Sequence, residues 1–204
     1  MFGKRIKLLI ATGNPGKVGE TTRLFGDAPV TLKTFHDFPD IKEVAETGST
    51  FKENAILKAK GYSFQTGLWT LADDSGLEIE ALNSAPGIHS ARYVSEKTDY
   101  NEKMSMLIKK LEHTGDTGRS ARFVCSMALA NGRGEIVLTS AGICEGKIAK
   151  TPRGTNGFGY DPIFIPAGFT GTFGELSDEI KQQISHRGRA SLKIMRYLLG
   201  FIVV

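Results

Sequence analysis

The sequence is poor in cysteine and lacks both a long apolar run and a large excess of charge of one sign. Its only cysteines, Cys125 and Cys144, lie in apolar, strand-like stretches without CxxC spacing, which argues against a disulfide framework or a cysteine metal site. No stretch approaches the roughly 18 apolar residues that a membrane span needs. The net charge of +4 comes without a dense basic run, so nucleic acid is not an expected partner.

What the chain does have is ordinary globular composition, with 204 residues of which 40% are hydrophobic and 24% are charged. This length suits a single domain with a sizeable core, and we take residues 1–204 as that domain. The slight positive excess favours small anionic ligands. The apolar stretch at residues 6–11 is too short for a signal-peptide core, so we expect a cytoplasmic protein without membrane contact.

Apolar stretches separated by turns predict an α/β protein with a mixed sheet. The first strand leads into a glycine-rich turn at residues 12–17, after which a helix begins. The two longest stretches form a predicted hairpin over a turn at residues 131–134. In chain order, the predicted strands are 6–11, 30–35, 69–72, 77–82, 121–130 and 135–148.

Capping signals and helical spacing predict the helices. Thr50 and Glu53 form a T-x-x-E capping box ahead of a helix that continues to about residue 63. Asn54 and Lys58 then lie one turn apart on one face of that helix. Apolar residues at helical spacing predict a further helix. Its core stripe consists of Met104, Leu107, Ile108 and Leu111.

The C-terminal part is predicted to hold a short helix from Ser177, a break at residues 185–188, and a last helix. The closing LLGFIVV is the end of a packing helix followed by a tail, which could reach a subunit contact. The expected buried side of the last helix consists of Leu192, Met195, Leu198, Leu199 and Ile202.

The turn ATGNPGKV is the first segment whose residues could bind a ligand or take part in catalysis. It fails the P-loop pattern, which needs four residues before the Gly-Lys pair and then Ser or Thr, whereas here Val18 follows Lys17. A glycine turn before a helix still offers backbone N–H groups to an anion, and Lys17 adds a point charge. The alternative is a tight turn with a surface lysine.

Acidic residues form the second segment, with Glu46 in ETGSTF and Asp73 and Asp74 in DDSGL. Magnesium prefers oxygen ligands and keeps several waters, so one or two carboxylates plus phosphate oxygens suffice. Neighbouring strand residues point to opposite faces, so Asp73 and Asp74 should not both face one ion in the same way. The alternative is a turn in which the aspartates bond backbone N–H groups.

The third segment, GFGYDPIFIP, places Phe158 and Tyr160 between glycines. Such rings can form a flat surface on which a purine stacks, or they can be core aromatics at a bulge. The fourth, SHRGRAS, follows Lys181 by one turn. Donors such as His186 and Arg187 favour the keto oxygen of hypoxanthine or xanthine over an amino group. The alternative is an N-cap at Ser185 followed by two solvated basic residues.

Together the segments resemble the Ham1/RdgB family of inosine triphosphate pyrophosphatases over nearly the whole chain. The order and spacing of the motifs carry the resemblance, because each one alone is weak. They are TGNPGK at 12–17, ETGSTFKENAILKAK at 46–60, LADDSGLEIEAL at 71–82, APGIHSARY at 85–93, ARFVCSMALA at 121–130, EGKI at 145–148, GFGYDPIF at 157–164 and ISHRGRAS at 184–191.

The resemblance implies a mixed α/β fold of the Maf/Ham1 kind, with a twisted central sheet flanked by helices and two lobes around a deep cleft. It also implies a homodimer and Mg²⁺-dependent hydrolysis of the purine nucleoside triphosphates ITP, dITP and XTP to the monophosphate and pyrophosphate. That reaction would clear the nucleotide pool before such nucleotides enter DNA or RNA.

Carried over position by position, the resemblance assigns Glu46 and Asp74 to the metal and makes Asp74 the proton acceptor that activates water. Asn54 and Lys58 would lie near the phosphates. The residues expected to hold the triphosphate are Thr12, Gly13, Asn14, Pro15, Gly16 and Lys17. Those expected to contact the nucleotide are Ser75, Phe158, Gly159, Tyr160, Asp161, Lys181, His186 and Arg187.

Two positions depart from the family pattern: His89 stands where Tyr is frequent, and Gln182 stands where Asn is frequent. Arg92 could line the cleft or cross a dimer contact, and the sequence does not decide between them. Two other functions stay open. One is a Maf-like pyrophosphatase for modified nucleotides, and the other is a nucleotide-sensing or RNA-binding module without catalysis.

Overall fold

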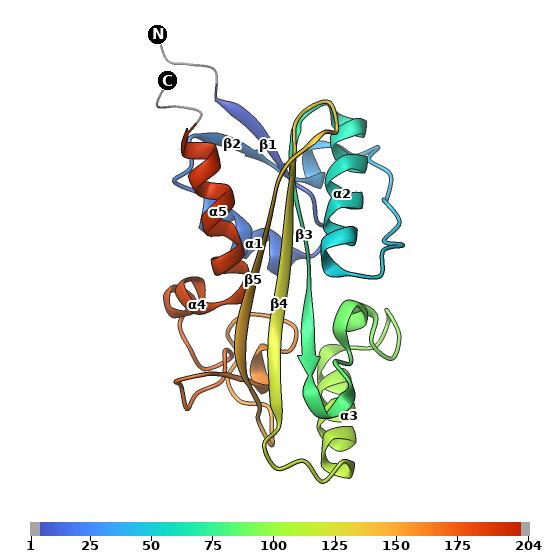
Figure 1. The fold of residues 1–204 in the computed structure, drawn as a ribbon, viewed down its shortest axis with the longest axis vertical. Helices are drawn as coiled ribbons and strands as arrows, with labels where there is room; N and C mark the ends of the chain where they lie inside the picture. Colours follow the sequence, from blue (N-terminus) through green and yellow to red (C-terminus); the bar gives the residue numbers. More distant parts are fainter. Residues whose placement is uncertain (1–4, 201–204) are drawn as a thin grey trace. The chain divides into compact units, whose positions relative to one another are not determined.

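The computed structural model describes residues 5–200, which form helices around a β-sheet (Figure 1). Among these residues, no helix is both long enough and apolar enough to cross a membrane. The helices and strands in chain order are β1 (Ile6–Ile10), α1 (Pro15–Phe25), β2 (Val30–Lys33), α2 (Phe51–Thr66), β3 (Trp69–Ile79), α3 (Tyr100–His113), β4 (Ser120–Ala130), β5 (Ile136–Ile148), β6 (Phe164–Pro166), α4 (Asp178–Ile184) and α5 (His186–Gly200).

The six strands form one mixed sheet in the order β2-β1-β3-β4-β5-β6. β1 pairs in parallel with both β2 and β3, and its Leu8 lies opposite Leu32 on one side and Trp69 on the other. β5 and β6 pair antiparallel. The prediction of a mixed sheet is therefore confirmed, and β4 and β5 occur as the two long strands expected on either side of the turn at residues 131–134.

The chain divides into two compact units, each with its own core. The first unit comprises residues 1–74, 125–142 and 187–204, and the second comprises residues 75–124 and 143–186. The second unit's core includes all four residues of the predicted helical stripe, Met104, Leu107, Ile108 and Leu111, packed with rings such as Phe123, Phe164 and Phe173.

In the first unit, neighbouring strand residues alternate between two apolar clusters, as the twofold period of a strand requires. Leu8 and Leu71 pack with residues of α1 and α5, such as Phe25 and Ile194. Their neighbours Leu9 and Ala72 pack in a second cluster with residues of α2, namely Ala55, Ala59 and Tyr62. Helices therefore bury both faces of this part of the sheet.

α2 begins as its capping signal predicts. The Thr50 hydroxyl accepts a hydrogen bond from the Glu53 backbone N–H, and the Glu53 carboxylate accepts one in return from Thr50 N. The helix ends at Thr66 and is followed by Gly67 in the left-handed conformation (φ 66°), which glycine adopts at little cost. The predicted start is confirmed, and the helix runs three residues beyond the predicted end.

The predicted strands at 69–72 and 77–82 are one strand, because β3 continues to Ile79 through the segment Asp73–Gly76, where a turn was the alternative. The predicted strand at 77–82 ends there too, and residues Glu80–Leu82 form a 3-10 turn. Aspartates favour turns when their side chains bond nearby backbone N–H groups. Here both carboxylates have charged partners from other elements, so the backbone stays extended.

The last helix also differs from its prediction. α5 begins at His186, so the break before it is limited to Ser185. Its buried apolar residues are Ala190, Ile194 and Leu198, at the helical spacing that continues from the buried Arg187. Burial of Arg187 thus selects the helix face, and the predicted core residues Leu192 and Leu199 are 56% and 45% exposed. The predicted contact of Ile202 lies outside the described residues.

Candidate functional site

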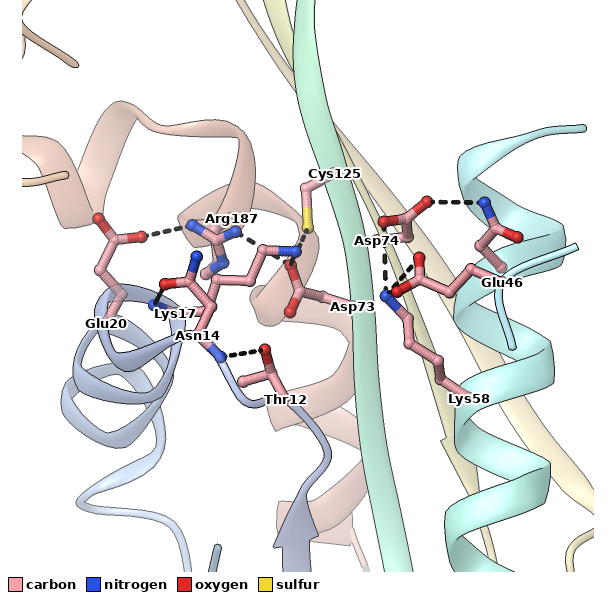
Figure 2. A network of polar contacts seen from close by, with 11 residues as sticks. Thr12, Asn14, Lys17, Glu20, Glu46, Lys58, Asp73, Asp74, Cys125 and Arg187 are labelled. Carbon is pink, nitrogen blue, oxygen red and sulfur yellow. Dashed lines mark hydrogen bonds and ion pairs between the residues drawn. The ribbon is translucent and has the colours of Figure 1, made fainter. Parts of the chain in front are cut away.

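Asp73 and Asp74 point to opposite faces of β3, as predicted (Figure 2). Asp73 follows Leu71 in the alternation and meets side chains of α1 and α5. Asp74 follows Ala72 and meets side chains of α2, one of which also pairs with Glu46 in the irregular segment before that helix. The strand thus presents one carboxylate to each of two separate polar networks in the first unit.

On the first face, two cations bind the Asp73 carboxylate. Lys17 Nζ lies 3.2 Å from Asp73 Oδ2, and Arg187 donates to the same oxygen at 3.0 Å. Arg187 also donates to Glu20 Oε2 at 2.5 Å. Asp73, Arg187 and Glu20 are all buried, so these are charged pairs largely removed from water. Breaking such a pair leaves an uncompensated buried charge.

The charges around Asp73 decide its ionisation. Burial alone would raise the pKa of Asp73, but the charges of Lys17 and Arg187 outweigh burial and hold the pKa well below its usual range. Nearby, burial and the Asp73 charge raise the pKa of the Cys125 thiol to about 12. Asp73 is therefore ionised throughout the physiological range, and Cys125 is an unreactive buried thiol.

The turn at residues 12–17 leads into the N-terminus of α1. Asn14 caps the helix by accepting from Lys17 N at 3.2 Å, and the Thr12 hydroxyl accepts from Asn14 N at 3.2 Å. Pro15 occupies the first turn, where its missing N–H costs nothing. These residues are partly or fully exposed, so a helix end with its positive dipole is open to an anion beside the Lys17 ammonium.

On the second face, Asp74 and Glu46 converge on one ammonium group. Lys58 Nζ lies 3.1 Å from Glu46 Oε2 and 3.4 Å from Asp74 Oδ1. Asn54 donates to Asp74 Oδ2 at 3.1 Å and is itself fixed by accepting from Gly48 N at 2.8 Å. Asn54 and Lys58 lie one helical turn apart, so the prediction that they share a face is confirmed.

The pKa of Asp74 shifts the opposite way from that of Asp73. Burial raises it, the charges of Lys58 and Lys17 lower it, and Glu46 raises it again, with a net rise above the usual value. Burial lowers the pKa of Lys58, but the surrounding carboxylates outweigh this and raise it. Asp74 is thus a carboxylate with a higher affinity for a proton than an ordinary aspartate.

The donor set at Asp74 fits a divalent cation that is shared with a ligand. Within residues 5–200, no group of three or more His, Cys, Asp or Glu side chains could hold a metal by itself. Magnesium needs fewer protein ligands, because one or two carboxylates complete its octahedron with waters and phosphate oxygens. Glu46 and Asp74 already surround one positive charge, and the Glu46 side chain is 32% exposed.

In the second unit, the turn at residues 157–161 is built around the Asp161 carboxylate. Asp161 Oδ2 accepts from Phe158 N at 2.7 Å and from Lys181 Nζ at 2.5 Å. Gly157 adopts φ 73°, and a Cβ there would overlap the Asp161 carboxylate, so only glycine fits. The Lys181 ammonium also lies 5.0 Å from the centre of the Phe158 ring. Segments far apart in sequence are thus joined by a buried ion pair.

The aromatic residue Tyr160 is 3% exposed, and its hydroxyl donates to Ser90 O at 2.9 Å. For this ring, the alternative of a core aromatic is confirmed. His186 is 4% exposed and stacks on Phe123 at 4.7 Å. The alternative of two solvated basic residues after Ser185 is therefore wrong for both His186 and Arg187. Ser75 continues β3 directly after Asp74.

Two residues of these networks were missed from the sequence. Glu20 lies one turn after Lys17 on α1, and that K-x-x-E spacing was the only available signal. Its partner Arg187 comes 167 positions later, a pairing that only the fold reveals. Tyr100, at the start of α3, packs edge-on against Tyr160 with ring centres 5.2 Å apart. A lone tyrosine at a helix start carries no sequence signal for such a contact.

The N-terminus of α1 can accept an anion beside Lys17, and two carboxylates converge on the Lys58 ammonium. These features are typical of a protein that binds a polyphosphate together with a divalent ion. Comparison with known proteins is consistent with that class. The chain belongs to the Ham1 family, whose model matches residues 8–197.

Similar proteins cover nearly the full length of the chain. A dITP/XTP pyrophosphatase of Exiguobacterium sp. strain AT1b is 44% identical over 197 residues, which are 97% of this chain and 99% of the relative. A dITP/XTP pyrophosphatase of Bacillus anthracis is 44% identical over 92% of this chain and 94% of its own. The solved structure of a HAM1 protein from Coxiella burnetii matches with a TM-score of 0.86 and 41% identity, covering 96% and 99% of the two chains.

Proposed function

We propose that this protein is a nucleoside triphosphate pyrophosphatase that hydrolyses ITP, dITP and XTP to the monophosphate and pyrophosphate, and so keeps these nucleotides out of DNA and RNA. The observation that carries the proposal is that the carboxylates of Glu46 and Asp74 converge on the same point, which the Lys58 ammonium occupies. Relatives at 44% identity that are named dITP/XTP pyrophosphatases support the same reaction. We treat residues 1–204 as one catalytic domain.

The first unit supplies the residues for the phosphate end of the substrate. The turn at residues 12–17 and the N-terminus of α1 accept phosphate oxygens, and Lys17 offsets their charge. Asp73 holds the Lys17 ammonium in place. Glu46 and Asp74 would hold Mg²⁺, which supplies charge neutralisation of the triphosphate and of the leaving pyrophosphate.

Asp74 is also the proton acceptor for the attacking water. A carboxylate with a raised pKa is a better base than an ordinary aspartate at neutral pH. Asn54 fixes its orientation through a hydrogen bond to Oδ2. The water then attacks the α-phosphorus in line with the departing pyrophosphate, so positioning and charge neutralisation provide most of the rate enhancement.

For the base, we propose the turn at residues 157–161 and the side chains that contact it. Phe158 offers the stacking ring, and Lys181, fixed by Asp161, offers a donor at its side. With His186, these donors favour a 6-keto purine, because an adenine amino group would place donor against donor. Arg187 donates to Glu20 and Asp73. We therefore propose that, besides any contact with the base, it holds Asp73 in position as the partner of Lys17.

A substrate panel tests the function. Pyrophosphate release is measured from ITP, XTP, dITP, GTP and UTP at equal concentration, each with and without Mg²⁺. We expect release from the first three, at least about tenfold above GTP and UTP, and only in the presence of the ion. Preference for UTP would indicate the Maf-like alternative, and no release from any of the five, with binding of ITP in a separate assay, would indicate a nucleotide-sensing module.

Two further proposals concern the protein as a whole and need separate measurements. We propose a homodimer, which sedimentation velocity tests directly, and a folded active monomer would contradict it without affecting the chemistry. We also propose residence in the cytoplasm, where the nucleotide substrates occur, which fractionation of the source cells tests.

A further inference from the structure

We propose that Tyr100 is a further specificity-determining residue, whose hydroxyl contacts the nucleoside part of the substrate beside the turn at residues 157–161. The inference rests on the proposed function, because it concerns how that substrate is recognised. Tyr100 is not part of any motif through which the chain resembles its family. Its assignment comes from packing within the second unit.

Two contacts hold the Tyr100 ring in position, and a helix cap next to it in the chain fixes the start of α3. Its edge meets the Tyr160 ring at 83° with centres 5.2 Å apart. The Lys103 ammonium lies 4.9 Å from the ring centre, and it donates to Ala91 O at 2.6 Å. Asp99 caps α3 directly before Tyr100 by accepting from Glu102 N. A ring fixed in this way can present its hydroxyl to a ligand without a large ordering cost.

The phenol end of Tyr100 lies beside Gly159. A Cβ built on Gly159 would lie 3.5 Å from Cε1, 3.7 Å from Cζ and 3.9 Å from the hydroxyl oxygen of Tyr100. Gly159 has φ 67°, a conformation that disfavours any side chain, so no side chain at this position covers the phenol end. The neighbouring residues Phe158 and Asp161 are those proposed to hold the base.

The hydroxyl of Tyr100 is available to a ligand. It has no hydrogen-bond partner among residues 5–200, and the residue is half-buried with its oxygen still in contact with solvent. The two tyrosines around it differ in this respect. The Tyr160 hydroxyl is engaged by Ser90 O, and the Tyr93 hydroxyl is buried. Of this aromatic cluster, Tyr100 alone offers a reachable hydroxyl.

Its surroundings also indicate what it would bind. Burial, and then the charge of Asp161, raise the pKa of Tyr100, so the hydroxyl is neutral and both donates and accepts at physiological pH. That carboxylate is paired with Lys181, so this side of Tyr100 carries no net positive charge that would attract a phosphate. A neutral polar atom of the nucleoside, either on the base edge or on the sugar, is therefore the matching chemistry, whereas the triphosphate is not.

The test compares Tyr100→Phe with the matched control Tyr93→Phe, which also removes one tyrosine hydroxyl from the cluster. We expect Tyr100→Phe to raise KM for ITP about fivefold, with kcat within about twofold, as loss of one neutral hydrogen bond predicts. Inhibition by inorganic tripolyphosphate, which lacks a nucleoside, should keep its wild-type strength. The control should match wild type in all three values, and both variants should melt within about 2 °C of it.

Comparing ITP with dITP identifies the atom. A rise in KM for ITP alone supports contact with the 2′-hydroxyl, and an equal rise for both supports contact with another nucleoside atom. Unchanged KM in Tyr100→Phe, or an equal weakening of tripolyphosphate inhibition, would overturn the inference while leaving the function intact. A wild-type protein that releases no pyrophosphate would instead overturn the proposed function.

Discussion

Asp73 and Asp74 are neighbours in the chain, but the two faces of β3 surround them with partners of different kinds (Figure 2). Asp73 faces two cations, Lys17 and Arg187, and is the negative centre of its network. Asp74 faces one cation, Lys58, which it shares with a second acid, Glu46. The first network balances its two cations with two acids, Asp73 and Glu20, whereas the second has two acids for one cation.

This difference gives the two aspartates different roles: Asp73 stabilises the fold, and Asp74 is suited to chemistry. The pKa of Asp73 is lowered, so its charge is permanent and anchors α1 and α5 to β3. The pKa of Asp74 is raised, so its charge is poorly compensated and accepts a proton or a metal ion readily. A buried site with spare negative charge costs stability, which is typical of positions that are retained for function.

The largest expected effect follows from Asp74→Asn. We expect kcat for ITP to fall by about three orders of magnitude or more, because the substitution removes both the base and a metal ligand. Nucleotide affinity in a binding assay should stay near wild type, since Lys17 and the α1 N-terminus are untouched. Residual turnover within about tenfold of wild type would show that Asp74 is not the base.

Asp73→Asn should act mainly on folding. It leaves Lys17 and Arg187 with one less buried negative charge, so we expect the free energy of unfolding to fall by about 3–5 kcal/mol in a urea titration. For Asp74→Asn, the free energy of unfolding should fall by less, because Lys58 still has Glu46 as an ion-pair partner. The matched surface control is Asp37→Asn, which breaks an exposed pair with Lys33 and should change little. Equal losses in all three variants would remove the distinction between the faces.

A smaller effect concerns the pH dependence of stability in the metal-free protein. Because the folded-state pKa of Asp74 is raised, the folded protein binds its proton more tightly than the unfolded chain does. Stability from this group is therefore gained as pH falls through the raised pKa and lost as pH rises through it. Unfolding titrations carried from neutral pH down toward the usual pKa of an aspartate should show this gain in wild type.

The comparison with variants isolates the source of that gain. Asp74→Asn should lack it, because the titrating carboxyl is gone. The lowered pKa of Asp73 makes its stabilisation constant over the same window, since that contribution is lost only at more acidic pH. If Asp74→Asn kept the full wild-type gain, another group would be responsible and the raised pKa of Asp74 would be contradicted.

Much of this site could be predicted from the sequence where the signal is local. The alternation of a strand separates Asp73 from Asp74, and helical spacing places Asn54 beside Lys58. The capping box at Thr50 gives the start of α2. Each of these follows from the backbone geometry of a single element, so no knowledge of the fold is needed.

The errors arise where distant partners override local preference. The DDSG segment predicts a turn by composition, but ion pairs with Lys17 and Lys58 keep both aspartates in an extended strand. Of the apolar stripe predicted for α5, Leu198 is buried and Met195 packs against the core, but Leu192 and Leu199 are exposed, because the buried face also includes Arg187. Partners separated by more than a hundred residues leave no trace in local sequence patterns.

The most direct test of the proposed chemistry is hydrolysis of ITP with Mg²⁺ in water enriched in a heavy oxygen isotope, followed by mass spectrometry of both products. If water activated at Asp74 attacks the α-phosphorus, the label appears in inosine monophosphate and none appears in pyrophosphate, and Asp74→Asn forms almost no labelled product. Label in pyrophosphate, or release of orthophosphate in its place, would contradict the account.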